Sequence, residues 1–257
     1  MDNLPPENTF VLYHRLPGNK YNNINYFNES EFNKIPKIDV VFIISAFIPN
    51  TKIAYNYNQD LFNVNVEFVN KIVQHFKDSR LIFASSVSVY NNAGDVIKEN
   101  SALNPSSSYA VSKLWGEIIV KQVNSYSIFR ISSLIGKGVK GETFVPMIIN
   151  QSIQKKSITL FGSGERKQNY INYSDVAQLF ISAAHLNNNS TYLAVNPYSF
   201  SNIEVAEKVK SLFPAVNINY LGKDSTESFI YDGSKTFAEL NFTPSISLTD
   251  SMLEIIK

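Results

Sequence analysis

The sequence predicts an α/β protein with a doubly wound parallel sheet and a smaller C-terminal α+β lobe. Short runs of β-branched and aromatic residues alternate with longer stretches that carry apolar residues at helical spacing, the pattern of successive strand–helix–strand units. Two strand-like runs, residues 39–46 (DVVFIISA) and 80–85 (RLIFAS), are almost continuously apolar, as expected for strands covered on both faces. Beyond about residue 137 the pattern of strand-like and helical runs changes. We expect a core at residues 1–137 and a lobe at 138–257, from which about 158–195 return to the core.

The elements are expected in a defined order along the chain. Strands are predicted at residues 9–14, 24–27, 39–46, 80–85, 127–132 and 191–195. Helices are predicted at residues 60–77, 107–123, 144–155, 174–185, 202–212, 233–240 and 248–256. Ser201 precedes the helix at 202–212 and Glu204 is its third residue, which is the arrangement of a capping box. Residues 161–170 (FGSGERKQNY) are predicted to form a loop between two helices.

Composition and charge exclude several classes of protein. A hydrophobic content of 44% and a charged content of 18% are typical of a globular chain. A net charge of +1 gives no general attraction for nucleic acid or anionic membranes, so an anionic ligand needs a local site. The chain has no cysteine and its three histidines lack metal-ligand spacing, so we expect neither disulfides nor a metal site. The absence of a secretory signal and of an apolar run of about 20 residues predicts a cytoplasmic protein.

The most informative residues are Tyr109 and Lys113, in the stretch YAVSK. A separation of four residues places both side chains on one face of a helix. A lysine ammonium near a phenol favours the phenolate, so we expect the pKa of Tyr109 to lie below its ordinary value of about 10. A tyrosine of this kind exchanges a proton with a hydroxyl or keto group near neutral pH. Ordinary helix-surface residues are the other reading of the pair, and both stay open.

Serine hydroxyls follow a predicted buried strand upstream of this pair. Ser85 ends the run at 80–85, and Ser86 and Ser88 come directly after it. Open α/β sheets bind their ligands at the carboxyl ends of the strands, so a serine here is placed to hydrogen-bond a substrate oxygen while Tyr109 moves its proton. The alternative is ordinary strand-end and turn chemistry.

Four segments together resemble one protein family. They are IFASSVSVY at 82–90, NPSSSYAVSKLWGE at 104–117, FRISSLIGKG at 129–138 and ITLFGSGERKQNYINYSDVA at 158–177. In order and spacing they resemble the extended short-chain dehydrogenase/reductases, and more narrowly the NAD(P)-dependent sugar-nucleotide epimerase, dehydratase and reductase group. The resemblance covers roughly residues 9–257. It implies a Rossmann-like fold, a small-molecule nucleotide sugar as substrate, and hydride transfer between a sugar carbon and a nicotinamide.

The resemblance also implies roles for individual residues. Tyr109 becomes the acid/base, Lys113 its pKa-lowering partner and a ligand of the nicotinamide ribose, and Ser86 the catalytic serine. The implied cofactor-binding residues are Arg15, Ser45, Ala46, Asn63, Ser85, Tyr109, Lys113 and Arg130. The implied substrate-binding residues are Ser86, Ser88, Ser133, Phe144, Arg166 and Gln168. For Arg130 a structural ion pair is an equally open reading.

Within these sets, Asn63 matches a helix asparagine of the family's active-site region. Small side chains at Ser45 and Ala46 would let a dinucleotide approach the backbone. Many relatives carry an Arg–Asp pair that contacts the nucleotide diphosphate, where this chain has Gln168 and Asn169. These departures weaken the resemblance to a standard uridine-diphosphate sugar enzyme.

One part of the family pattern has no counterpart in the sequence. The family opens with a strand, a Gly-rich turn and a helix that holds the dinucleotide pyrophosphate, whereas residues 9–14 resemble its second strand. We therefore expect about 25–30 residues, one strand–helix unit, to be missing. A truncated chain, a misassigned start and a relic with weak dinucleotide binding all stay open. Arg15, just beyond the second strand, favours a 2′-phosphate, so NADP is preferred to NAD as the cofactor.

The resemblance favours some of the family's reactions over others but does not identify a single one. The 4,6-dehydratases carry an Asp–Glu pair directly after the catalytic serine or threonine, where this chain has Val87 and Ser88. The sequence therefore favours a 4-keto reductase or a 4-epimerase over a dehydratase. The alternative is a cofactor-deficient, non-catalytic homologue that binds a sugar nucleotide or a partner protein. No nucleic acid or membrane partner is expected, and a homodimer stays open.

Overall fold

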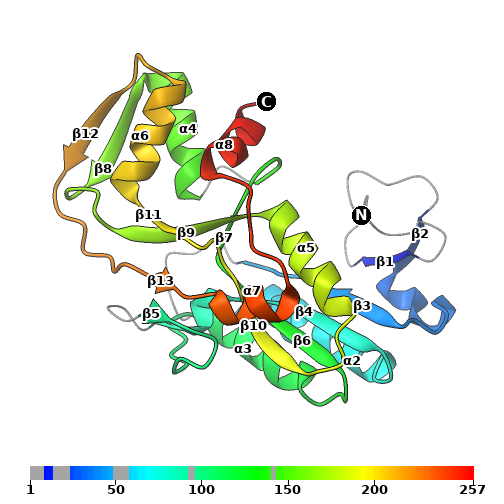
Figure 1. The fold of residues 1–257 in the computed structure, drawn as a ribbon. Coiled ribbons are helices and arrows are strands. Elements are labelled where there is room, and N and C mark those ends of the chain that lie inside the picture. Colours follow the sequence, from blue (N-terminus) through cyan, green and yellow to red (C-terminus); the bar gives the residue numbers. More distant parts are fainter. Residues whose placement is uncertain (1–8, 14–23, 49–57, 92–95, 140–142) are drawn as a thin grey trace.

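The computed structural model describes residues 9–13, 24–48, 58–91, 96–139 and 143–257. At its centre is a parallel four-stranded sheet with the order β10-β6-β4-β3 (Figure 1). These strands are β3 (Val40–Ile43), β4 (Arg80–Ser86), β6 (Tyr126–Ile131) and β10 (Ser190–Ala194). Strands that are adjacent in the sheet and separated by helices along the chain confirm the predicted α/β fold.

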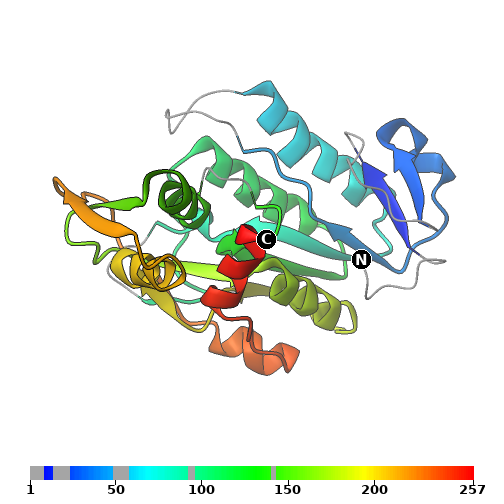
Figure 2. The same ribbon diagram turned by 90° about the horizontal axis from the view of Figure 1, so that it is seen from above.

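Helices cover both faces of this sheet (Figure 2). The helices of one face are α2 (Phe68–His75) and α3 (Ser108–Val120), and those of the other are α5 (Tyr173–Ala184) and α7 (Ser234–Leu240). Alternate residues of β4 divide between the two faces. Leu81 and Phe83 lie in the core beneath α2 and α3, whereas Ile82 lies in the core beneath α5. Burial on both faces explains why β4 is a continuous apolar run in the sequence.

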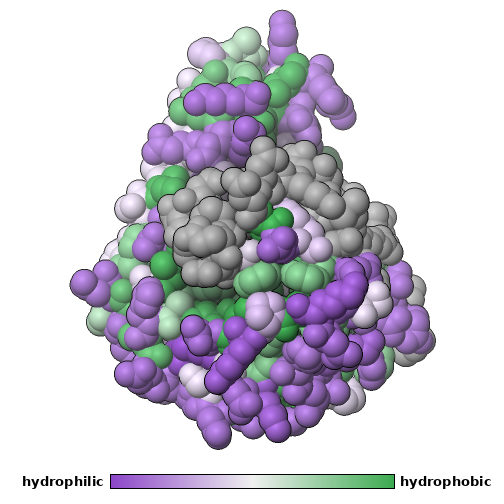
Figure 3. Space-filling model, turned by 90° about the vertical axis from the view of Figure 1, so that its right-hand side faces the viewer, coloured by the Kyte–Doolittle hydropathy of each residue, from purple (hydrophilic) through white to green (hydrophobic). Residues whose placement is uncertain are grey.

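The first two described strands form a sheet of their own. β1 (Phe10–Tyr13) and β2 (Asn25–Asn28) pair in parallel, and the short helix η2 (Glu29–Lys34) follows them. Within the described ranges β3 is thus an edge strand of the four-stranded sheet, and Ile44, expected to be buried, is 66% exposed. The face on this side of the molecule is hydrophilic over much of its lower part, with hydrophobic residues gathered nearer its middle (Figure 3). The expected further strand–helix unit stays a prediction.

The smaller lobe lies at the upper left of Figure 1. Its elements are α4 (Phe144–Lys155), β8 (Ser157–Phe161), α6 (Asn202–Leu212), β12 (Asn217–Leu221) and α8 (Leu248–Ile256). The three helices and β8 share one buried cluster, which includes Ile158 and Leu160. Ile171 is the first residue after β8 that packs in the core of the sheet domain. The chain therefore returns to the core later than the expected residue 158.

A three-stranded sheet with the order β11-β9-β7 lies between the two parts. Its strands are β7 (Ser133–Ile135), β9 (Lys167–Asn172) and β11 (Ser199–Ser201). The prediction of a loop at 161–170 was wrong for residues 167–170, because the polar side chains of β9 hid a strand that pairs on both sides. The capping box predicted at Ser201 and Glu204 is confirmed.

Two further short strands, β5 (Val96–Ile97) and β13 (Ile230–Tyr231), pair with each other beside the sheet domain. Ile97 of β5 shares a small buried apolar cluster with Val89 and Val195. No helix among the described residues combines the length and the apolar character needed to cross a membrane.

Gly116 lies where α3 packs against β4, and a Cβ built there would lie 2.6 Å from Cζ of the fully buried Phe83. Overpacking costs about 1–3 kcal/mol, while alanine gains about 1 kcal/mol of helix propensity over glycine. We therefore expect Gly116→Ala to lower the free energy of unfolding by up to about 2 kcal/mol, measured by urea denaturation. Ile118→Ala, at a position 57% exposed on the same helix, is the control. A Gly116→Ala variant more stable than the wild type would contradict this close packing.

Candidate active site

Ser86 and Tyr109 meet where strand β4 ends and helix α3 begins. Ser86 is the last residue of β4, and its Oγ accepts a hydrogen bond from the backbone N–H of Ser88 at 3.2 Å. Helix α3 begins after Ser107, whose Oγ accepts from the N–H of Ala110, so Tyr109 lies in the first turn. The Ser86 side chain lies close enough to the Tyr109 hydroxyl to favour its phenolate. The two residues predicted to act on a substrate oxygen are therefore neighbours.

The protonation of Tyr109 differs from the expectation. Burial raises the pKa of Tyr109 above its ordinary value of 10.0, and the neighbouring Ser86 hydroxyl lowers it by a smaller amount. Lys113 does not contribute to this shift, although it lies one helical turn further along α3. The expected lowering of the Tyr109 pKa is therefore wrong, because desolvation of the phenolate outweighs the other effects. Tyr109 is a protonated phenol at neutral pH.

Lys113 carries a buried ammonium group without a hydrogen-bond partner among the described residues. The residue is 1% exposed, and Nζ lies 4.5 Å from the centroid of the Phe83 ring, a cation–π contact. Burial lowers the pKa of Lys113 from its ordinary value of 10.5 to about 8, and the charge of Glu117 opposes this effect. A buried charge without hydrogen bonds costs free energy, so this ammonium is suited to donate to oxygen atoms of a ligand.

Two serine hydroxyls in the same part of the sheet also lack a partner among the described residues. Ser45 follows β3, and Ser88 lies in the 3-10 turn η4 (Val87–Val89) that follows β4. The Oγ atoms of both residues are buried and make no hydrogen bond. Ala46 beside Ser45 is exposed, so its small side chain leaves the backbone open. The carboxyl ends of two neighbouring strands thus present unsatisfied donors, as a polar ligand requires.

Asn63, the asparagine expected in the active-site region, lies two residues before a second asparagine, Asn65. Helix α1 (Gln59–Phe62) continues through the π-helical turn η3 (Asn63–Glu67) into α2. Asn63 is exposed and accepts a hydrogen bond from Gln59, whereas Asn65 is fully buried. Asn65 accepts from the N–H of Phe47 at 2.7 Å and donates to the carbonyl of Phe47 and to Ser112 Oγ, each at 3.0 Å. Asn65, not Asn63, thus joins the segment after β3 to α3.

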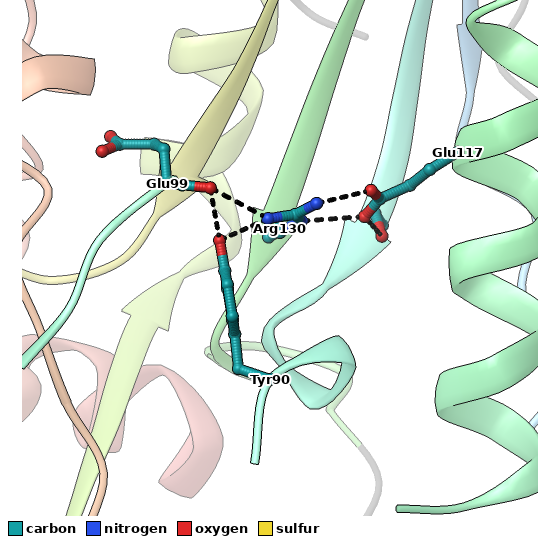
Figure 4. A network of polar contacts seen from close by, with 5 residues as sticks. Tyr90, Glu99, Glu117 and Arg130 are labelled. Atoms are coloured by element: carbon teal, nitrogen blue, oxygen red, sulfur yellow. Dashed lines mark hydrogen bonds and ion pairs between the residues drawn. The ribbon is translucent and has the colours of Figure 1, made fainter. Parts of the chain in front are cut away.

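Arg130 lies at the centre of a buried polar network with Glu117, Tyr90 and Glu99 (Figure 4), and Ser85 also bonds to Glu117. Arg130 Nε and Nη2 donate to the two carboxylate oxygens of Glu117, at 2.9 and 2.7 Å. Arg130 Nη1 donates to Tyr90 Oη at 2.5 Å and to the Glu99 carbonyl at 3.1 Å. Ser85 Oγ donates to Glu117 Oε1 at 2.6 Å. These contacts favour the ion-pair reading of Arg130, and the cofactor-binding role expected of Ser85 stays a prediction.

The residues expected to bind substrate fall into two groups. Ser86 and Ser88 lie beside Tyr109, as described above, whereas no described contact joins the others to it. Ser133 is exposed at the start of β7, and Phe144 packs against the core of the lobe. Arg166 Nε donates to the Glu227 carbonyl at 3.2 Å, and Gln168 Nε2 donates to Asn202 Oδ1 at 2.8 Å. Arg15 lies outside the described residues.

Asn169 has a structural role that the sequence reading missed. Its Nδ2 donates to the carbonyls of Asn196 and Tyr198 and to Ser199 Oγ, and its Oδ1 accepts from Ser132 Oγ and the N–H of Asn196. An aspartate could not make the three donated bonds. The side-chain amide of Asn169 therefore holds the segment at residues 196–199 in a way that a carboxylate could not. Among the described residues no cluster of histidine and carboxylate side chains is suited to hold a metal ion.

Comparison with known proteins assigns the family. The profile of the NAD dependent epimerase/dehydratase family matches residues 2–196, more than half of the chain, and the chain belongs to this family. A dTDP-4-dehydro-6-deoxyglucose reductase of Escherichia coli is 28% identical over 193 residues, which is 69% of this chain and 60% of that protein. An uncharacterized UDP-glucose epimerase of Bacillus subtilis (strain 168) is 27% identical over 147 residues, 54% of this chain and 46% of that one. The match thus spans about half the length of these relatives.

Solved structures share the fold over most of the chain. The UDP-N-acetylglucosamine 4-epimerase from Methanobrevibacter ruminantium M1 superposes with a TM-score of 0.83 at 19% identity, covering 97% of this chain and 89% of that one. The UDP-glucuronic acid 4-epimerase from Bacillus cereus, solved with UDP-glucuronic acid and NAD, gives 0.78 at 20% identity, covering 91% and 81%. These similarities establish a Rossmann-like fold of the sugar-nucleotide epimerase and reductase type.

Because Asn65 is buried and Asn63 is exposed, substitutions at the two positions test which asparagine holds the segment after β3. Asn65→Ala leaves the N–H and carbonyl of Phe47 without partners, so we expect a loss of about 1–3 kcal/mol in the free energy of unfolding. Asn63→Ala removes only an exposed contact and should change stability by no more than about 0.5 kcal/mol. Urea denaturation of both variants measures the difference. Equal losses would show that Asn65 does not hold the segment after β3.

Proposed function

We propose that this chain is an NAD(P)-dependent oxidoreductase or epimerase that acts on a nucleotide-linked sugar. The observation that carries the proposal is the placement of Ser86 beside Tyr109, with a Lys113 ammonium one helical turn away that no described residue hydrogen-bonds. Membership of the NAD dependent epimerase/dehydratase family and the similarity to a bacterial sugar-nucleotide reductase support it. The finer proposal is a 4-keto reductase or a 4-epimerase.

The proposed cofactor is a nicotinamide dinucleotide, which would supply the acceptor or donor of a hydride. Lys113 would hold it through hydroxyl oxygens, because the ammonium is buried and no described residue accepts a hydrogen bond from it. Ser45 and Ala46 would line its approach beside the end of β3. The expected preference for NADP over NAD rested on Arg15 and has no support from the Bacillus cereus relative, which was solved with NAD. We therefore propose either NAD or NADP as the cofactor, with no preference between them.

Tyr109 would exchange the proton in this reaction. Its phenol is protonated at neutral pH, because burial raises its pKa, and a protonated phenol is ready to donate to a developing alkoxide oxygen. Ser86, beside Tyr109, would orient the same oxygen. This protonation state supports reduction of a keto sugar as the favoured direction. Val87 and Ser88, next to Ser86, supply no carboxylate pair for a dehydration.

The test of this proposal removes one hydroxyl from the site. Tyr109→Phe should lower kcat for a dTDP- or UDP-linked 4-keto sugar by about 10²–10⁴-fold, because the phenol is the proton donor and the ring packing is unchanged. Turnover is followed by NADH and NADPH absorbance, and unfolding curves check that the fold is retained. Tyr220→Phe, at a residue 56% exposed on β12, should keep full activity. A loss below about tenfold in Tyr109→Phe would point to another proton donor.

A further inference from the structure

Glu117 extends the line of site residues along helix α3. Tyr109, Lys113 and Glu117 follow one another at intervals of four residues, so the three side chains lie along one face of the helix. Glu117 is fully buried, like Lys113. A carboxylate one turn from a buried ammonium lies close enough to stabilise its charge.

The carboxylate of Glu117 ties α3 to two strands of the sheet. Its Oε1 accepts from Ser85 Oγ on β4, and both of its oxygens accept from Arg130 on β6 in a bidentate pair. Ser85 is the neighbour of Ser86 in β4. A displacement of Glu117 would therefore move the helix that carries Tyr109 relative to the strand that carries Ser86.

The same network reaches the turn that follows β4. The Arg130 guanidinium lies 4.8 Å from the centroid of the Tyr90 ring and donates to the Tyr90 hydroxyl. Tyr90 directly follows η4, which contains the unpartnered Ser88. A buried ion pair contributes little net stability compared with apolar side chains of similar size. The informative feature of this pair is thus its position between the elements that carry the site.

We propose that Glu117 is the positioning residue of this site, which aligns α3 with β4 and keeps the Lys113 ammonium charged. The inference rests on the role proposed above for Lys113. The charged and titratable groups that act on one another here are Lys113 and Glu117 on α3, Arg130 on β6, Tyr90 after η4, and Glu99, which acts on Tyr90. Of these, Glu117 is the group that raises the pKa of Lys113.

The balance between burial and Glu117 decides the charge of Lys113 near neutral pH. Burial lowers the pKa of Lys113 to about 8 even with Glu117 in place. At pH 7 about nine-tenths of such a lysine is protonated, and a further fall of one pH unit would leave about half protonated. Loss of the Glu117 charge would therefore remove much of the ammonium on which the proposed ligand contact depends.

The experiment measures the pKa of Lys113 directly by ¹³C NMR of protein labelled at lysine Cε, with Lys113→Met identifying the signal. In Glu117→Gln we expect the pKa of Lys113 to fall by about one pH unit, the effect of losing a nearby opposite charge. Because Glu117→Gln leaves the buried Arg130 charge unpaired, Glu117→Gln/Arg130→Gln is measured as well. It should give a smaller fall in the Lys113 pKa, because a nearby positive charge is removed together with the carboxylate. Ser85→Ala keeps the carboxylate and should leave the Lys113 pKa unchanged.

The measurement needs neither substrate nor turnover, so it separates this inference from the proposed function. An unchanged Lys113 pKa in the folded double variant would overturn the role of Glu117, whatever the activity of the protein. A fall of the same size in Ser85→Ala would also overturn it, because the effect would then come from loosened packing. A lowered Lys113 pKa with full activity of Tyr109→Phe would instead support the inference and contradict the proposed reaction.

Discussion

The close contact of helix α3 with strand β4 is the constraint on which the rest of the site depends. Gly116 lets the helix lie against Phe83, and the next residue, Glu117, reaches across to Ser85 and Arg130. This contact sets the separation between the strand that ends in Ser86 and the helix turn that carries Tyr109. Asn65 also braces this helix, through its hydrogen bond to Ser112. A larger side chain at Gly116 or a missing bond at Glu117 would disturb the same distances.

The site combines apolar packing with polar groups that are left unsatisfied. The Lys113 ammonium lies above the Phe83 ring and has no hydrogen-bond acceptor among the described residues. The buried hydroxyls of Ser45 and Ser88 also lack a hydrogen-bond partner among these residues. Burying these groups without hydrogen bonds lowers the free energy of unfolding, and contacts elsewhere in the core must offset this loss. By contrast, four donated bonds engage Arg130 in the adjacent network. The first three groups can therefore still hydrogen-bond a ligand, whereas the donors of Arg130 are already engaged by protein acceptors.

The sequence predicted the sheet domain well because its strands are covered on both faces and its helices show strong periodicity. It failed at β9, whose polar residues bond to loops rather than pack in an apolar core. Ser86 and Tyr109 were predictable because they flank well-marked elements, and their contact follows from the fold. Asn65 was missed because a π-helical turn changes which residue faces inward. The competing roles of Arg130 could not be resolved without knowing that Glu117 lies opposite it.

The central claim is that Lys113 and its neighbours form the site of a nicotinamide dinucleotide. Calorimetric titration of the wild type and of Lys113→Met with NADH and with NADPH tests it most directly. Lys113→Met should fold, because it removes an unpartnered buried charge. The account predicts at least about a tenfold loss of affinity in Lys113→Met, as expected for a lost charge-assisted hydrogen bond, with no loss in Ile118→Ala. Equal affinity of the wild type and Lys113→Met for both dinucleotides would contradict it.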